Sequence, residues 1–482
     1  MHVVHKTNKS PKRAHGKIVL LSAIILISFI TKIALAWVTR DTISYFDEWG
    51  YYEAAELQLE DPNFVEVFRP SAYICFLTGI FWIFGKSLFA AKAAQVLLST
   101  FSVVLLYGIA RRIFSEKVAL TAAGIFAFYP NLVAFTHYLW RETFFIFLVL
   151  SFFYFLFPVS SNYRRYHTLL AGIIIGLIAL TRPDIVSLLL VSFIYFFCTE
   201  RRWSRTLSKT LILLFGIAIV LFPWTIRNYI FTGRFMLVSA DSGKHLWHSL
   251  NTMIKYGEDY RIYELFDEPG FYEPGDVIFP GSNRGREINR PESSQSNIVD
   301  VYHEEVANAL EFVFDNPWLV IKRMWPKFCI LWGPNSFVIR HLRLGIYGKN
   351  FATGGWPIKI YPPENMALVK AVTLIVTLSY SFVIITGLLG MIFHKPSKKS
   401  LSLILYIIFS TAIISFLLGM SRYRLKLMPF IIIFSAYGIC HVKEIVKAPD
   451  RKLRWLLFCI LFALFLAICA LYVPILFDIF QQ

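Results

Sequence analysis

The chain has 482 residues, of which 56% are hydrophobic and only 16% are charged, and its mean hydropathy is +0.57. This composition excludes an ordinary soluble domain, in which about a quarter of the residues are charged. The formal net charge is +17, because 48 Lys and Arg residues outnumber 31 Asp and Glu residues.

Apolar runs recur along the whole chain. A helix needs about 20 apolar residues to cross a bilayer. The runs predict eleven membrane spans, near residues 17–38, 87–110, 118–136, 140–158, 168–182, 184–199, 209–226, 366–393, 400–420, 425–442 and 455–476. The fifth and sixth runs are short, and only the turn at residues 181–184 divides them. The sequence therefore predicts an all-α polytopic membrane protein.

Basic residues gather in alternate loops and before the first span. They are Lys6, Lys9, Lys12, Arg13, Lys17, Arg111, Arg112, Lys117, Arg164, Arg165, Arg201, Arg202, Arg205, Lys209, Lys395, Lys398, Lys399, Lys443, Lys447, Arg451, Lys452 and Arg454. The positive-inside rule places these loops and the N-terminus in the cytoplasm. No basic patch alternates with solvent-facing aromatic residues, so we expect no nucleic-acid partner. No small-residue cleavage site follows the first span, which predicts an uncleaved anchor.

This topology divides the chain into consecutive parts. They are a cytoplasmic basic tail (1–16), an N-terminal transmembrane module (17–226) that includes a first outer loop (39–86), an extracytoplasmic segment (227–365) and a C-terminal transmembrane module (366–482).

The two outer regions contain shorter elements. Residues 71–84 are apolar but too short to cross a bilayer, which predicts an interfacial or re-entrant helix. In the long outer segment, residues 274–296 have the composition of a loop, whereas residues 298–314 have helical apolar spacing. We therefore expect a small, partly helical outer domain.

A short acidic motif, Phe46-Asp47-Glu48-Trp49-Gly50-Tyr51-Tyr52, follows the first span. Carboxylates are costly near a bilayer, so Asp47 and Glu48 are candidate functional residues. The alternative is a solvated acidic loop, which is also the simpler explanation for the other acids between residues 41 and 66.

Arginines recur at the outward ends of later spans, where the positive-inside rule predicts few of them. They are Arg141, next to Glu142, and Arg182, Arg227, Arg422 and Arg424. A guanidinium pairs bidentately with phosphate, so these arginines are candidates for binding an anion at the membrane surface. The alternatives are an ion pair between Arg141 and Glu142, and interfacial anchoring by Arg227, Arg422 and Arg424.

Carboxylates and arginines on one face suggest transfer of a group from a lipid phosphate. The phosphate can leave when fixed cations stabilise its charge, and a carboxylate can take the proton of the acceptor. Asp47, Glu48 and Glu142 could also hold a divalent cation, although no histidine spacing supports a metal site. The sequence therefore requires no cofactor and leaves a divalent cation possible.

An ordered set of motifs resembles the C-type membrane glycosyltransferases, in the bacterial branch related to dolichyl-phosphate-mannose–protein mannosyltransferases and lipid A aminoarabinose transferase. The matching pieces are Asp47-Glu48-Trp49-Gly50-Tyr51, Arg69-Pro70-Ser71-Ala72-Tyr73, Phe81-Trp82-Ile83-Phe84-Gly85, Tyr107-Gly108-Ile109-Ala110-Arg111-Arg112-Ile113-Phe114, Arg141-Glu142-Thr143, Gly176-Leu177-Ile178-Ala179-Leu180-Thr181-Arg182-Pro183, Phe222-Pro223-Trp224-Thr225-Ile226-Arg227-Asn228-Tyr229, Gly233-Arg234-Phe235, Asn316-Pro317-Trp318 and Ser421-Arg422-Tyr423-Arg424-Leu425.

The resemblance implies a polyprenyl-phosphate-linked sugar as donor and an envelope glycan, lipid or protein as acceptor. It also implies inverting transfer on the extracytoplasmic face of the inner (plasma) membrane. Asp47 would be the catalytic base and Glu142 the second acid of such a site. The chain departs from relatives that have a proline pair at Arg69-Pro70-Ser71, and the outer stretch around Asp267-Glu268-Pro269-Gly270 matches no motif of the family.

Two other classes of function are compatible with the composition. A transporter or flippase of a lipid-linked saccharide would also place arginines near a phosphate, but it typically has polar residues at mid-membrane and repeated halves. The middles of the predicted spans are apolar and the chain has no internal repeat, which favours chemistry at the surface. A scaffold subunit would not require acids and arginines to converge.

Overall fold

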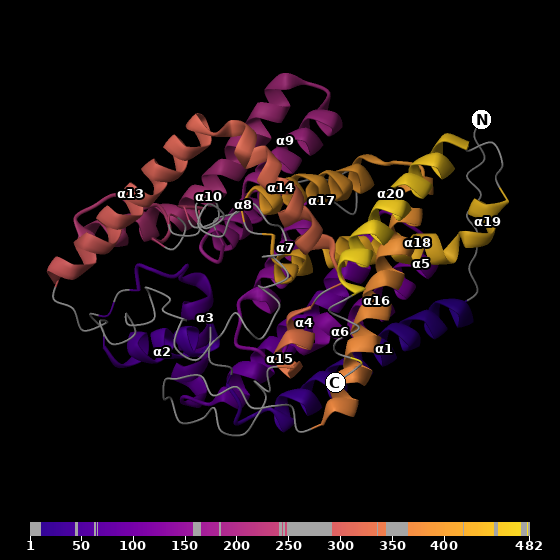
Figure 1. The fold of residues 1–482 in the computed structure, drawn as a ribbon, viewed down its shortest axis with the longest axis horizontal. Helices are drawn as coiled ribbons and strands as arrows, with labels where there is room; N and C mark the ends of the chain where they lie inside the picture. Colours follow the sequence, from indigo (N-terminus) through magenta and orange to yellow (C-terminus); the bar gives the residue numbers. More distant parts are fainter. Residues whose placement is uncertain are drawn as a thin grey trace.

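The computed structural model describes residues 11–43, 47–61, 64, 66–157, 165–182, 185–240, 243, 246–247, 292–334, 336–343, 365–417, 419–447, 452–473 and 480. Across these residues the regular elements are all helices and none is a strand, which confirms the predicted all-α class. Figure 1 shows the helices packed side by side as a bundle.

The helices of the first half are α1 (Pro11–Val38), α2 (Asp47–Glu60), α3 (Ala72–Phe84), α4 (Leu88–Arg111), α5 (Glu116–Phe128), α6 (Pro130–Ala134), α7 (Glu142–Leu156), α8 (Arg165–Ala179), α9 (Val186–Glu200) and α10 (Trp203–Thr232). The second half contains α13 (Glu292–Asp315), α14 (Pro317–Trp332), α15 (Phe337–Arg343), α16 (Met366–Phe393), α17 (Lys398–Phe416), the 3₁₀ helix η4 (Ser421–Lys426), α18 (Met428–Cys440), α19 (Val442–Val446) and α20 (Lys452–Leu471).

Each predicted span overlaps at least one of these helices, and the span at 118–136 overlaps both α5 and α6. Among the described residues, α1, α4, α10, α16, α17 and α20 are long and apolar enough to cross a membrane. The helices α7, α8, α9 and α18 are apolar but have only 13 to 15 residues, and α5 has 13. A helix can end at membrane depth where neighbouring protein buries its irregular ends, and α7 and α18 are buried along most of their length.

The elements found in the two regions predicted to face outward agree with most of the predicted pattern. The short apolar stretch after residue 70 forms α3, a helix of 13 residues. The second predicted helix is α13, but it begins at Glu292, so residues 292–296 are helical where the sequence predicted a loop. Apolar spacing misses this start because the first turn of α13 is polar. The rest of the predicted loop lies outside the described residues.

Glycines bring the transmembrane helices into close contact. A Cβ atom at Gly216 of α10 would stand 2.6 Å from the carbonyl oxygen of Leu169 in α8, and one at Gly172 would stand 2.2 Å from the carbonyl oxygen of Leu213. The backbones of α8 and α10 therefore touch, which only the absence of a side chain permits.

Gly216→Ala should therefore lower the free energy of unfolding by about 1–3 kcal/mol, because the added methyl forces α8 and α10 apart. Gly124→Ala in α5 is the matched control, since the nearest atom to its Cβ would be Ile24 Cδ1 at 3.9 Å. Thermal unfolding in detergent would measure both variants. Equal transition temperatures would contradict this packing.

The pair α2 and α3 forms a small unit of its own. Tyr51, Ala55, Tyr73 and Leu77 belong to a hydrophobic core that these helices share. At the far end of this unit, Lys86 Nζ lies 2.6 Å from Glu56 Oε1 and also contacts Glu60, and these hydrogen bonds raise the pKa of Lys86. The arrangement presents the start of α2 to the helical bundle.

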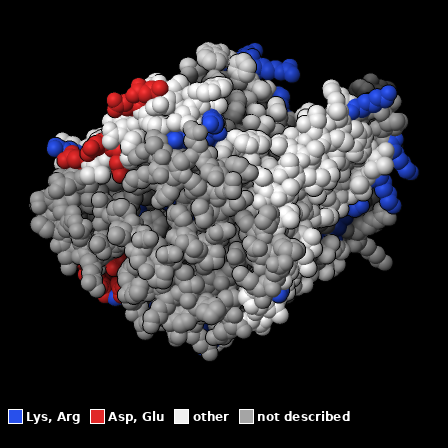
Figure 2. Space-filling model, in the orientation of Figure 1, with Lys and Arg blue, Asp and Glu red and all other residues white. Residues whose placement is uncertain are grey.

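Charge is unevenly distributed over the visible surface. Figure 2 shows Lys and Arg at the right edge, around α19 and the start of α20, and at the top near α9. Asp and Glu lie at the left, where Figure 1 places α13 and α2, together with some Lys and Arg. A white zone of uncharged residues lies between the centre of this view and the basic right edge. Such an uncharged side surface is typical of a protein that spans a bilayer.

Candidate functional site

The first acidic motif forms the start of α2. Asp47 is the first residue of α2, and its side chain lies outside the described residues. Glu48 is buried, and its Oε1 accepts a hydrogen bond of 2.6 Å from the backbone N–H of Leu139. A Cβ atom at Gly50 would stand 2.4 Å from Arg69 Nη2. The glycine of the motif therefore leaves room for a guanidinium on the surface of α2.

The loop between α6 and α7 is fixed from two sides. Besides the bond from Glu48, Gln95 Nε2 of α4 donates to the carbonyl oxygen of Tyr138 at 2.6 Å. Gln95 Oε1 in turn accepts from the hydroxyl of Tyr73 at 3.1 Å. All these groups are buried, so each bond persists without competition from water. This loop leads directly to Arg141 and Glu142.

Glu142, Arg182 and Arg422 meet although they come from three different parts of the chain. Glu142 is the first residue of α7, Arg182 follows α8, and Arg422 lies in η4. Glu142 Oε1 lies 3.2 Å from Arg182 Nη2 and 3.6 Å from Arg422 Nε. The three side chains are only 4%, 8% and 11% exposed. The structure thus brings together three of the residues that the sequence proposed.

Aromatic rings surround the two arginines. The guanidinium of Arg422 lies 5.1 Å from the ring of Trp140, 5.6 Å from Phe337 and 5.5 Å from Tyr423. Arg182 lies 4.3 Å from the ring of Tyr423. Cation–π contacts within about 6 Å are attractive and strengthen when water is excluded. The rings therefore hold both guanidinium groups in place.

The positive charge of this group exceeds the charge of Glu142. Arg141 is buried and donates to the carbonyl oxygen of Thr181 at 3.2 Å. Its positive charge repels that of Arg182. Lys426 is also buried, and the charge of Arg182 repels the Lys426 ammonium. Repulsion between buried cations favours an anionic ligand that lies among them.

Arg227 belongs to a second charged group. Its Nη1 donates to the carbonyl oxygen of Glu66 at 3.5 Å, and its guanidinium lies 4.2 Å from the ring of Trp224. The Glu66 carboxylate lies 3.3 Å from Arg69 Nη1. Glu53 of α2 faces the same group: burial raises the pKa of Glu53, and the charge of Arg69 opposes this shift. This second group therefore joins α2 to the end of α10.

Arg424 binds the C-terminal end of α14. Its Nη1 donates to the carbonyl oxygen of Leu331 at 3.0 Å and also to that of Gly333. The guanidinium lies 4.0 Å from the ring of Tyr380, whose hydroxyl donates to the carbonyl oxygen of Trp332 at 2.7 Å. The last carbonyl groups of α14, which have no partner within the helix, are thereby satisfied. Arg424 thus fixes η4, which also carries Arg422.

Sequence reasoning missed the aromatic residues around Arg422 and the buried Lys92 of α4. Trp140 and Phe337 are ordinary residues in an apolar sequence, and only the fold brings them to one arginine. Lys92 could have been identified from the sequence, because a charged residue inside an apolar run marks a candidate functional position. In the part of the chain that the structure describes, no group of three His, Cys, Asp or Glu residues could hold a metal ion.

Part of the chain matches a known family. Residues 69–226 match the family model for dolichyl-phosphate-mannose-protein mannosyltransferase, a stretch that includes Arg141, Glu142 and Arg182. A search of the curated proteins finds no match. The resemblance predicted from the sequence motifs is thereby confirmed for this region.

The solved structures identify the fold. The archaeal oligosaccharyltransferase AglB from Archaeoglobus fulgidus, in complex with an inhibitory peptide and a dolichol-phosphate, matches with a TM-score of 0.52 and 15% identity. The apo form of the Archaeoglobus fulgidus oligosaccharyltransferase matches with a TM-score of 0.51 and 17% identity. The chain has the fold of a C-type membrane glycosyltransferase. Each match covers 96% of this chain and 55% of the other, so this chain spans about half the length of those proteins.

A third structure, ArnT from Cupriavidus metallidurans bound to undecaprenyl phosphate, has 14% identity and a TM-score of 0.41. That match covers 91% of this chain and 79% of ArnT.

The bond between Glu48 and Leu139 yields a prediction about the site. Glu48→Ala should lower the free energy of unfolding by about 1–3 kcal/mol, because a buried N–H group loses its acceptor. Glu48→Gln keeps the oxygen and should cost less. Thermal unfolding in detergent compares the two, with Asp41→Ala as the control because the Asp41 side chain is 84% exposed. Equal losses in Glu48→Ala and Asp41→Ala would remove this role from Glu48.

Proposed function

We propose that this protein is an integral membrane glycosyltransferase that moves a sugar from a polyprenyl-phosphate donor to an envelope glycolipid, polysaccharide or protein. The observation that carries the proposal is the group of Glu142, Arg182 and Arg422, whose side chains are at most 11% exposed and which places two arginines beside a single carboxylate. The family match and the fold support this reaction class. The AglB structure, in which a dolichol-phosphate is bound, supports a lipid phosphate as the ligand.

The residues would divide the reaction between them. Arg422 and Arg182, with Arg141, hold the phosphate of the donor and stabilise the negative charge that develops on it. Asp47 takes the proton of the acceptor hydroxyl as that oxygen attacks the anomeric carbon. The bond between the anomeric carbon and the phosphate oxygen breaks as the new glycosidic bond forms on the opposite face. The configuration is therefore inverted, and the lipid phosphate is the second product.

The remaining predicted residues would act beside this centre. Glu142 fixes the two arginines, and Glu48 fixes the loop that carries Arg141. Arg227 contributes a further cation from the end of α10. Arg424 acts mainly through η4, where it sets the position of Arg422.

The site would face the outside of the plasma membrane. The basic residues of the alternate loops support a cytoplasmic N-terminus, because positive charge is retained on the cytoplasmic side. A donor assembled on a polyprenyl lipid would then reach the site within the outer leaflet, and the transferred unit is a hexosyl or pentosyl group.

Mass spectrometry of envelope glycolipids and glycoproteins, with and without the gene, tests the proposal. Loss of a single glycosyl unit, with the acceptor otherwise intact, is the expected result. A lipid-linked saccharide transporter would instead abolish delivery of the complete saccharide. An unchanged set of glycans would count against both activities.

The outer segment after α10 is proposed to select the acceptor, because loops on a rigid scaffold commonly set binding specificity. Residues 265–297 lie almost wholly outside the described residues, so this assignment rests on topology and composition. Exchange of this stretch for that of a relative with another acceptor should change acceptor choice and leave donor use intact. A folded chimera with the original acceptor preference would identify the stretch as a structural cap.

A further inference from the structure

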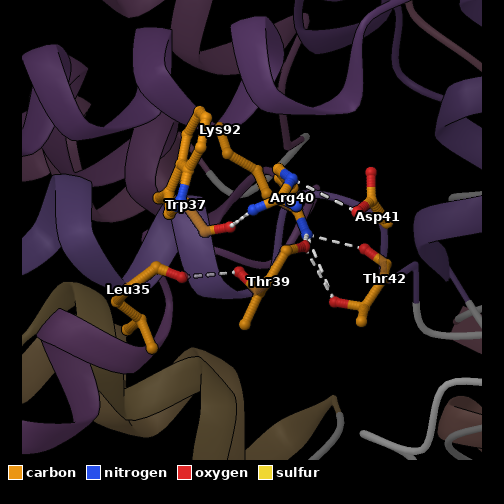
Figure 3. Close-up of polar contacts among 7 residues, drawn as sticks. All are labelled: Leu35, Trp37, Thr39, Arg40, Asp41, Thr42 and Lys92. Atoms are coloured by element: carbon orange, nitrogen blue, oxygen red, sulfur yellow. Dashed lines mark hydrogen bonds and ion pairs between the residues drawn. The ribbon is translucent and has the colours of Figure 1, made fainter.

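A buried lysine binds the connection between α1 and α2. Lys92, in the second turn of α4, is 1% exposed. Figure 3 shows its ammonium directed at the carbonyl oxygens of Thr39 and Thr42. The bond to Thr42 O measures 2.6 Å, and Thr42 Oγ1 lies at 3.5 Å. An ammonium has three N–H donors, so these three oxygens match its donor capacity.

These oxygens belong to the turn that ends α1. The backbone N–H and the hydroxyl of Thr42 both donate to the carbonyl oxygen of Thr39, at 3.0 and 2.9 Å. The last carbonyl groups of a helix carry the negative end of its dipole and have no partner inside the helix. A buried cation at this end therefore fixes both the position and the direction of the chain as it leaves α1.

The turn leads within a few residues to the proposed catalytic acid. Asp47 and Glu48 open α2, and the charge of Glu48 attracts the Lys92 ammonium. Glu48 is itself bonded to Leu139, in the loop that carries Arg141. Lys92 thus lies where α1, α2 and the loop before α7 converge.

We propose that Lys92 is a positioning residue for the transfer reaction. Its bonds to residues 39 and 42 fix the end of α1, and this sets the position of the acids at the start of α2. The catalytic consequence rests on the proposed function. The effect on the position of α2 does not, so the two can be tested separately.

The same pair of helices provides a matched control. Lys32 of α1 is also 1% exposed, and its ammonium donates to Ser99 Oγ of α4 at 2.9 Å. Both lysines are buried between α1 and α4, and methionine would remove the charge of each while keeping most of its length. Only Lys92 binds the turn that leads to α2. A purely structural role predicts similar effects of Lys32→Met and Lys92→Met.

The test compares the full-length variants by hydrogen–deuterium exchange in detergent micelles and by product formation in a complemented deletion strain. Lys92→Met should speed exchange in residues 39–60, whereas Lys32→Met should leave these residues near wild type. Product per folded molecule should fall on the order of 10- to 100-fold in Lys92→Met, the cost of a small misplacement of a reacting group. Affinity for undecaprenyl phosphate, used as the probe, should change less than about twofold, because the arginines remain in place.

The test also includes a conservative variant that should restore function and outcomes that would overturn the proposal. Lys92→Arg, which keeps donors for the two carbonyl oxygens, should restore most of the protection and product. Equal exchange or equal product in Lys92→Met and Lys32→Met overturns the proposal, and Lys92→Gln replaces Lys92→Met if the latter does not fold. Absence of product from the wild-type chain overturns the proposed function instead, and the exchange comparison still decides the role of Lys92.

Discussion

Asp47→Asn is expected to lower sugar transfer by on the order of 100- to 10,000-fold, the usual contribution of a well-placed general base. The amide keeps the shape of the side chain but cannot accept the proton of the acceptor hydroxyl. Donor binding should persist, because the phosphate is proposed to contact arginines on other elements. The measurement is product formation per folded molecule, together with binding of undecaprenyl phosphate.

A matched acid separates this role from general charge in the first outer segment. Glu60→Gln removes a carboxylate at the other end of the same helix, where the Glu60 side chain is 55% exposed and pairs with Lys86. It should leave transfer within about twofold of wild type, as exposed pairs contribute little. Activity of Asp47→Asn within a few-fold of wild type would exclude Asp47 as the base.

The membrane character of the fold could be predicted because bilayer thickness and loop charge leave strong marks on composition. Each of the eleven predicted spans contains a helix, and the short helix α3 was also predicted. The lengths of α7 and α18 could not be predicted, because whether a helix may end inside the bilayer depends on the neighbours that bury its ends. Those neighbours are distant in sequence.

The candidate site was predictable in part for a similar reason. Arginines on the side predicted to face outward contradict the usual distribution of charge, so Arg182 and Arg422 stand out in the amino-acid sequence alone. Their common partner Glu142 is also a candidate there, but the pairing could not be deduced, since it joins residues from α7, the end of α8 and η4. Sequence patterns could not show that Arg227 and Arg424 have partners other than Glu142. Arg227 lies beside Glu66, and Arg424 binds the end of α14.

Arg422→Lys is expected to lower transfer by about 30- to 1,000-fold, which corresponds to about 2–4 kcal/mol of lost transition-state stabilisation. A planar guanidinium can face Glu142, lie among the rings of Trp140 and Phe337, and still present an N–H edge to a phosphate. An ammonium is a compact point charge and cannot meet all these partners together. The loss should therefore appear although the charge is conserved.

Two further Arg→Lys variants are needed to interpret the activity of Arg422→Lys. Arg234→Lys is the control, because Arg234 pairs with Asp300 at 2.9 Å while both side chains are at least half exposed, and it should have little effect on transfer. Arg227→Lys tests the second charged group, where a partial loss is expected because Arg227 is only part-buried and lies beside Glu66. Normal transfer by both Arg422→Lys and Arg227→Lys would exclude bidentate phosphate binding at these positions. A loss confined to Arg422→Lys would assign the phosphate to the group around Glu142, because this group, unlike the one around Arg227, combines nearly buried arginines with several aromatic rings.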